Sequence, residues 1–386
     1  MLHVLFTFGT RPEAIKLAPV ITHMLGRPEE FRVSVCLTSQ HKEMLRQVTD
    51  FFSIREDVDL DIMLPNQTLE HITSAVLLNM RGVLEELRPD VLLVQGDTTT
   101  VFASSLAAFY AKIPVGHVEA GLRTFNKYSP FPEEINRTLT ASIAEYHFAP
   151  TTTAADNLRR EGRAEAGIHI TGNTVVDALL LGKSLLERWE PAQRRGLLLE
   201  AGLREDATDR LLSGVSRFIT VTAHRRESFG EPFEQMLQAM LEIVAGHGDV
   251  EIVYPVHRNP NVREPVERLL SGNARIHLLD PLRYEQLLFL MDHSTLLLTD
   301  SGGIQEEGPS LRKPVLVMRE VTERPEGIDA GVSRLVGTDR ARIVDTVRSL
   351  LTDKAQYEAM ATGINPYGDG EASRRIADIL LGGGRG

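Results

Sequence analysis

The feature that most constrains the fold is an alternation, along the whole chain, of short apolar runs with segments of helical periodicity. Leu2 to Phe8 is the first such run and stops at Gly9. In the next segment apolar residues recur every three or four positions, from Ala14 to Leu25, as expected for a helix with one buried face. Parallel strands joined by crossover helices produce this pattern, so we predict an α/β fold.

The strand pattern occurs in two series, separated by a polar, charged stretch at about 193–216. The first series comprises residues 2–8, 33–37, 91–94, 115–118, 146–148 and 168–170, and the second comprises 218–222, 251–256, 276–279, 295–298 and 315–317. We therefore predict two domains, each with its own parallel sheet. The first is expected to span 1–172, with the border near Gly172 and Asn173.

Charge and cysteine content exclude several classes of protein. The 386 residues include 42 Lys and Arg against 53 Asp and Glu, a net charge of −11, so we expect no binding to nucleic acid or to an anionic membrane surface. No run reaches the roughly 18 apolar residues of a membrane span. The single cysteine, Cys36, lies in an apolar run, which predicts a buried thiol, no intrachain disulfide and a cytoplasmic protein.

Ligands of open α/β sheets lie beyond the carboxyl ends of the strands, so charged residues in those loops are candidates for a site. The first such loop is Gly9 to Glu13, followed by Lys16. Arg11 and Lys16 stand near a helix N-terminus, where phosphate binds readily. The alternative is a solvated first turn with an ordinary Glu-Lys pair.

A second candidate loop, Asp300-Ser301-Gly302-Gly303, follows a strand of the second series and opens a predicted helix. Two glycines allow a ligand to approach the backbone, and Ser301 with free amides can hold a diphosphate. Glu306 and Glu307 come one turn later and suit ribose hydroxyls. The alternative for these two acids is a solvated helix start.

Three carboxylates, Asp97, Glu119 and Glu133, lie in strand-end segments of the first series. Acids that converge on one site can remove a proton from carbon and return it. Each acid taken singly is also explained as a helix N-cap or a surface charge. Glu133 and Arg137 stand four residues apart, so a helical salt bridge would account for them as well.

Histidines and arginines gather after the first two strands of the second series, at His224, Arg225, Arg226 and His257. Such residues bind phosphate or assist proton transfer. No Cys or His pair has the spacing of metal ligands, and neither GxGxxG nor GxxxxGK[ST] occurs. We therefore expect no metal and no nicotinamide cofactor.

In order along the chain, the sequence resembles the non-hydrolysing UDP-N-acetylglucosamine 2-epimerases from about residue 3 to residue 375. The resemblance is carried by the segments GTRPEAIKLAPV, QGDTTT, HVEAGLRT, FPEEINR, TGNTVVDAL, TAHRRESFG, YPVHRNPNV, TDSGGIQEEGPSLRKPVLVMR and ERPEGI. It implies the GT-B architecture, in which two Rossmann-like domains face each other across a cleft that holds the active site. The second domain would span 173–360, and 361–386 would return to the first domain with a helix at about 371–381.

The resemblance also implies a reaction and roles for residues. The family interconverts UDP-GlcNAc and UDP-ManNAc without an added cofactor, by eliminating UDP to leave 2-acetamidoglucal and re-adding it, which supplies ManNAc units for surface polysaccharides. A homodimer is implied as well. Four residues match the family's catalytic positions: Asp97, Glu119, Glu133 and His224. Eight match positions that hold UDP or its sugar: Arg11, Lys16, Arg137, Ser301, Gly302, Gly303, Glu307 and Arg324.

Many bacterial members bind a second UDP-GlcNAc as an activator. The matching positions here are Gln40, Glu43, Gln67, Arg225 and His257. Glu43 replaces a glutamine and Asn66 replaces an arginine, so we expect a weak activator site. Two other functions share the predicted fold and the diphosphate loop: a GT-B glycosyltransferase that uses a UDP-sugar, and a nucleotide-sugar sensor without activity.

Overall fold

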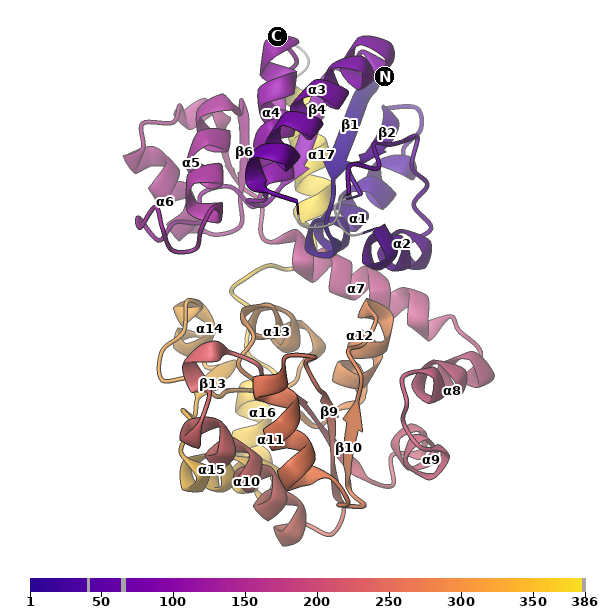
Figure 1. The fold of residues 1–386 in the computed structure, drawn as a ribbon, viewed down its shortest axis with the longest axis vertical. Coiled ribbons are helices and arrows are strands. Elements are labelled where there is room, and N and C mark those ends of the chain that lie inside the picture. Colours follow the sequence, from indigo (N-terminus) through magenta and orange to yellow (C-terminus); the bar gives the residue numbers. More distant parts are fainter. Residues whose placement is uncertain (40–41, 64–66, 384–386) are drawn as a thin grey trace. The chain divides into compact units, whose positions relative to one another are not determined.

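The computed structural model describes residues 1–39, 42–63 and 67–383, and the chain forms two compact units (Figure 1). Unit 1 comprises Met1–Ala178 and Tyr367–Gly386, and unit 2 comprises Leu179–Pro366. The corresponding borders expected from the sequence are 172/173 and 360/361. The chain leaves unit 1 within helix α7 (Thr174–Glu187).

Unit 1 is built on a seven-stranded parallel sheet in the order β3-β2-β1-β4-β5-β6-β7. Its strands are β1 (Leu2–Phe8), β2 (Phe31–Leu37), β3 (Val58–Asp59), β4 (Val91–Gln95), β5 (Val115–Val118), β6 (Tyr146–Ala149) and β7 (Ile168–Ile170). Its helices are α1 (Arg11–Leu25), α2 (Lys42–Phe51), α3 (Leu69–Leu87), α4 (Thr99–Tyr110), α5 (Glu133–Ile143), α6 (Thr152–Arg160) and α17 (Ala372–Gly383), with a 3-10 turn at Glu165–Gly167. Helix α17, yellow in Figure 1, packs against α1, and Arg27 pairs with Asp378 at 2.9 Å.

Unit 2 contains a six-stranded parallel sheet in the order β10-β9-β8-β11-β12-β13. Its strands are β8 (Arg217–Thr222), β9 (Val250–Pro255), β10 (Ile276–Leu279), β11 (Leu296–Thr299), β12 (Val315–Val317) and β13 (Ser333–Leu335). Its helices after α7 are α8 (Pro191–Glu200), α9 (Glu205–Ser213), α10 (Glu231–Gly246), α11 (Pro260–Leu270), α12 (Tyr284–His293), α13 (Gly302–Glu307), α14 (Pro325–Asp329), α15 (Arg340–Thr352) and α16 (Lys354–Ala361), with 3-10 turns at Arg226–Ser228 and Gly308–Leu311.

The predicted α/β class is confirmed, and every predicted strand occurs within two residues of its expected ends. Strands β3 and β13 were not predicted. β3 has two residues, both half-buried, and β13 is three residues long with an exposed arginine at its centre. Neither has the apolar run on which a strand prediction depends.

Buried apolar residues fill both faces of each sheet, as parallel sheets require. All five residues of β4 are buried, and Leu92 and Val94 pack in one cluster with Val76 and Met80 of α3. Cys36 is fully buried in the same cluster, and burial raises the pKa of its thiol to about 12, so the prediction of a core thiol is confirmed. Among the described residues, no helix is long and apolar enough to cross a membrane.

Candidate functional site

In unit 1 the strand-end loops converge on the carboxylate of Glu119, which directly follows β5. Its Oε1 accepts hydrogen bonds from Lys16 Nζ at 2.5 Å and Asn173 Nδ2 at 3.2 Å, and its Oε2 accepts one from Gln95 Nε2 at 2.5 Å. Glu119 is 9% exposed and adopts a left-handed backbone with φ of 65°. Non-glycine residues hold this conformation at a cost, and such strain clusters at functional sites.

Asp97 lies in the neighbouring loop, after β4, and is paired with an arginine. Its Oδ2 accepts from Arg137 Nε at 2.9 Å and Nη2 at 2.7 Å, while its main-chain oxygen accepts from Asn136 Nδ2 at 2.9 Å. Arg137 also contacts buried Glu134 at 3.2 Å. Arg137 thus pairs with Asp97 and Glu134, whereas the alternative from the sequence was a helical pair with Glu133.

Glu133 is the first residue of α5 and is half-buried. Its Oε2 is inaccessible to solvent and has no hydrogen-bond partner in the described part of the chain. A buried carboxylate oxygen without a donor is costly, and a carboxylate can take up or deliver a proton.

The loop after β1 is held by Glu13, a residue that the sequence did not single out as a site residue. Its Oε2 accepts from the backbone N–H groups of Gly9 at 2.9 Å and Thr10 at 2.7 Å, and its Oε1 accepts from Thr98 Oγ1 at 2.5 Å. Burial raises the pKa of Glu13, although these bonds oppose the shift. Glu13 thus ties the Arg11 loop to the loop of Asp97, and it is not part of a solvated turn.

In unit 2, Asp300 fixes the loop of His224. Asp300 is fully buried, and its Oδ2 accepts from the backbone N–H groups of His224 at 2.6 Å and Arg225 at 2.7 Å. The His224 ring lies 3.5 Å from Asp300 Oδ1 and stacks on His257, with ring centres 5.4 Å apart. Burial lowers the pKa of His224, and the Asp300 charge opposes that shift. The structure thus brings His224 and His257 together, as their clustering in the sequence indicated.

Ser301 is the N-cap of α13, and Gly302 and Gly303 are the first two residues of that helix, beside Arg324. A Cβ atom added to Gly302 would lie 3.9 Å from the guanidinium of Arg324, which pairs with buried Glu306. Glu306 and Glu307 are 4% and 8% exposed, so they do not form a solvated helix start.

The proposed activator residues are only partly described. Gln40 and Asn66 lie outside the described residues. Glu43 is exposed in the first turn of α2, and Gln67 Nε2 donates to the carbonyl oxygen of Ile62. Arg225 Nε is buried without a hydrogen-bond partner in the described part of the chain.

The polar residues at the two sheet edges can transfer protons and bind anions. In unit 1, carboxylates held by cations and amides lie at the carboxyl ends of the strands. In unit 2, glycines, an arginine and histidines lie at the carboxyl ends of the strands. Across residues 1–39, 42–63 and 67–383, no three His, Cys, Asp or Glu side chains are grouped to hold a metal ion.

Several supporting residues were missed from the sequence. Gln95, Asn173 and Asn136 hold Glu119 and Asp97. Gln95 stands at a strand end and Asn173 stands just after one, and this position in the sequence could have indicated them as site residues. Asn136 instead reaches Asp97 from within α5, which requires knowledge of how the helix packs.

Comparison with known proteins gives a consistent result. The sequence model of the family described as UDP-N-acetylglucosamine 2-epimerase matches residues 23–381. The chain is 54% identical over 379 residues to the UDP-N-acetylglucosamine 2-epimerase of Escherichia coli (strain K12), with 98% of both chains covered. It is 49% identical over 380 residues to that of Bacillus subtilis (strain 168), covering 98% of this chain and 95% of the other.

A solved structure supports the same relationship. The crystal structure of UDP-GlcNAc 2-epimerase from Neisseria meningitidis bound to UDP-GlcNAc has a TM-score of 0.84 to this chain and 46% sequence identity. The match covers 99% of this chain and all of the other.

Proposed function

Since the chain belongs to the UDP-N-acetylglucosamine 2-epimerase family, with its GT-B class of two Rossmann-like domains, we propose that it interconverts UDP-GlcNAc and UDP-ManNAc by elimination and re-addition of UDP. A base removes the C2 proton as the bond from C1 to the UDP oxygen breaks, which leaves 2-acetamidoglucal. A proton then enters the opposite face of C2 and UDP returns to C1. We place this reaction in the cytoplasm. Its product supplies ManNAc units for the synthesis of surface polysaccharides.

The observation that carries this proposal is a pair of carboxylates, each hydrogen-bonded by a cation, at the carboxyl ends of the unit 1 strands. Glu119 is held by Lys16, and Asp97 is held by Arg137, each at 2.5 to 2.9 Å. Moving a proton onto and off a carbon atom needs positioned acids and bases, and the neighbouring cations limit repulsion between the carboxylates. Glu133, whose buried Oε2 has no hydrogen-bond partner among the described residues, is the third candidate for proton transfer.

Formation of UDP-ManNAc from UDP-GlcNAc alone is the direct test. The purified chain, incubated with UDP-GlcNAc and no acceptor, is expected to give both epimers at equilibrium by chromatography. A glycosyltransferase would leave UDP-GlcNAc intact without an acceptor. A sensor would bind the nucleotide sugar with no conversion, and either result would reject the proposal.

We assign the binding of the UDP diphosphate to Ser301, Gly302, Gly303 and Arg324, with Glu307 at the ribose. The leaving diphosphate carries negative charge, which an arginine and free backbone amides stabilise. Burial lowers the pKa of His224, and its ring N–H can donate a hydrogen bond to the leaving group. Arg11, Lys16 and Arg137 match the other substrate-binding positions of the family, and we propose that they bind the nucleotide sugar.

Replacing Gly303 with valine is expected to lower UDP affinity at least about tenfold without unfolding the protein. Among the described residues, an added Cβ at Gly303 meets Ser301 Oγ at 3.8 Å, an ordinary van der Waals contact, so the fold has room for a Cβ there. A diphosphate held close to the backbone would collide with it. Calorimetry with UDP measures the effect.

The matched control for this substitution is Gly246→Val, at the end of α10, where an added Cβ meets nothing within 4 Å. This variant is expected to bind UDP like the unmodified protein. Unchanged UDP affinity in Gly303→Val would remove the segment from the binding site.

We also propose that a second UDP-GlcNAc binds weakly, at the residues matched to the activator site. Glu43 places a negative charge where a glutamine is common, and Asn66 removes a guanidinium that could bind phosphate in a bidentate manner. The expected result is a hyperbolic UDP-GlcNAc saturation curve and conversion of UDP-ManNAc without a lag. A lag that traces of UDP-GlcNAc abolish would show that Gln40, Gln67, Arg225 and His257 suffice.

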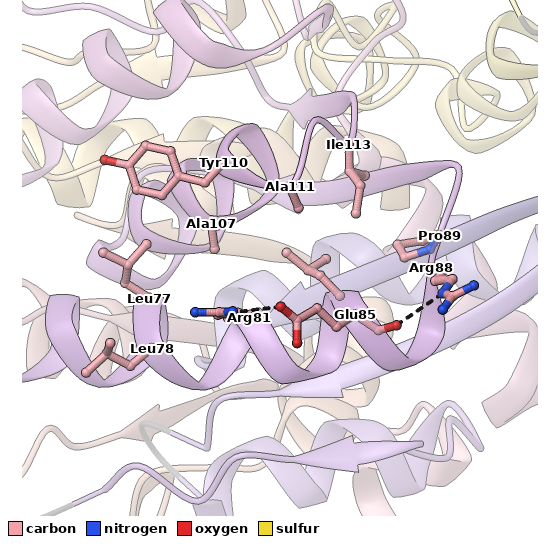
Figure 2. A pocket seen from close by; sticks show the side chains of 11 residues that line it. Leu77, Leu78, Arg81, Glu85, Arg88, Pro89, Ala107, Tyr110, Ala111 and Ile113 are labelled. Carbon is pink, nitrogen blue, oxygen red and sulfur yellow. Dashed lines mark hydrogen bonds and ion pairs between the residues drawn. The ribbon is translucent and has the colours of Figure 1, made fainter.

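We propose a homodimer through a surface groove between α3 and α4 (Figure 2). The groove has a volume of about 990 Å³ and is lined by residues such as Leu78 and Tyr110, which are 73% and 67% exposed. Arg81 and Glu85 lie beside this apolar surface, 2.8 Å apart. A two-fold interface brings a surface patch against the same patch of a second copy. A patch that has an apolar centre and carries one positive and one negative side chain is complementary to itself. Light scattering is expected to give twice 42.9 kDa, and a monomer mass would contradict the proposal.

A further inference from the structure

A buried histidine beneath the unit 1 site has no part in the roles assigned so far. His117 lies in β5, two residues before Glu119, and is completely buried. Its Nε2 is 2.7 Å from the main-chain oxygen of Gly96, the residue before Asp97. The ring therefore contacts the loop of one proposed catalytic acid from the strand that carries another.

This contact defines the state of the imidazole. A carbonyl oxygen only accepts hydrogen bonds, so Nε2 carries the proton and donates it. Nδ1 is then unprotonated, and it is buried with no hydrogen-bond partner in the described part of the chain. Burial lowers the pKa of His117 to about 3, and the charges of His147 and Arg123 act in the same direction while Glu119 and the Gly96 bond oppose it. Burial therefore favours the neutral form of the ring.

The backbone of Gly96 and Asp97 is held by hydrogen bonds at three successive peptide groups. Gly96 has φ of 83°, and its N–H donates to the oxygen of Val118, at 3.1 Å. His117 holds its carbonyl, and Asn136 holds the carbonyl of Asp97 at 2.9 Å. The backbone that carries Asp97 is thus tied directly to β5, the strand that Glu119 follows.

We propose that His117 is a positioning residue. Its hydrogen bond to the Gly96 carbonyl keeps Asp97 at a fixed position relative to Glu119 for proton transfer at C2. The proposal rests on the proposed function. A reacting group displaced by about 1 Å costs up to about 10²-fold in rate, so loss of one such bond is expected to affect kcat and leave substrate binding largely intact.

Three variants separate positioning from simple packing. His117→Phe keeps the ring volume without the donor, and His117→Gln keeps an N–H donor at a similar reach. His147→Phe is the matched control, because His147 is the register partner of His117 on β6 and is 3% exposed, with no hydrogen bond to the Asp97 loop.

The expected result is a fall in kcat of roughly tenfold or more for His117→Phe, with KM for UDP-GlcNAc within about twofold of the unmodified enzyme. His117→Gln should have a kcat close to that of the unmodified enzyme. His147→Phe should keep the kcat of the unmodified enzyme. Equal losses in His117→Phe and His147→Phe, or a glutamine variant no better than phenylalanine, would overturn the proposal.

Nitrogen-15 NMR of the histidine rings in the unmodified protein tests the bond without any activity. His117 is expected to show the Nε2–H tautomer and no titration between pH 5 and 8. An Nδ1–H tautomer, or a titration near the ordinary histidine pKa of about 6.5, would overturn the proposed bond. An unmodified protein that binds UDP-GlcNAc without epimerising it would instead contradict the proposed function, whatever the NMR result.

Discussion

Replacing Glu119 with glutamine is expected to lower kcat by about 10²-fold or more, the scale of a lost general acid or base, with little change in UDP affinity. Lys16 and Asn173 donate to one Glu119 oxygen and Gln95 donates to the other. A glutamine amide would present an NH₂ group to a donor on one side, and it cannot accept a proton from carbon. Initial rates of UDP-ManNAc formation, with UDP binding measured in parallel, give both quantities.

Glu161→Gln is the matched control for this substitution. Glu161 forms two bonds with Arg123, at 2.6 and 2.9 Å, in the same unit, and the Arg123 side chain is 1% exposed. Breaking this pair leaves a buried guanidinium without its carboxylate and should lower the unfolding temperature, while kcat is retained. If Glu119→Gln retained near-native kcat, Glu119 would be excluded from proton transfer.

Asp97→Asn is expected to lower kcat by a similar factor, about 10²-fold or more. The substitution removes the charge that faces Arg137 Nε and Nη2, at 2.9 and 2.7 Å, and with it the ability of this side chain to take up a proton. Arg137 would then keep only Glu134 of its two carboxylate partners. Initial rates of UDP-ManNAc formation measure the loss.

Asp249→Asn is the control. Asp249 also forms two hydrogen bonds with Arg217, at 2.7 and 3.0 Å. It lies directly before β9, at the end of the unit 2 sheet where the strands begin. This substitution should leave kcat unchanged, and an equal loss in both variants would show that Asp97 acts only through general stability. Near-native kcat in Asp97→Asn would likewise remove it from the catalytic residues.

The sequence predicted the strands and the loops better than it predicted the partners within the site. Apolar runs define buried parallel strands directly, and parallel strands bring their carboxyl ends to one edge, so Asp97 and Glu119 could be placed in neighbouring loops. The pairing of Lys16 with Glu119 joins residues 103 apart along the chain. No local pattern distinguishes that pair from a Glu-Lys pair within one helical turn.

Buried polar residues were the hardest to assign. The sequence pattern indicates a first-turn acid at Glu13, but the structure buries this side chain, and donors from two loops bind its carboxylate. His117 stands inside an apolar strand pattern, where a histidine is ordinarily only a packed side chain. Its bond to Gly96 depends on the register of β4 against β5 and on the positive φ of Gly96, neither of which is visible in the sequence.

Proton exchange at C2 is the most direct test of the central claim, that these carboxylates move a proton between the two faces of the sugar. UDP-GlcNAc incubated with the protein in D₂O and followed by NMR is expected to give UDP-ManNAc with deuterium at C2. Asp97→Asn and Glu119→Gln should slow that incorporation together with epimerisation. Epimerised product that retains hydrogen at C2 would contradict the elimination mechanism and the roles given to Asp97, Glu119 and Glu133.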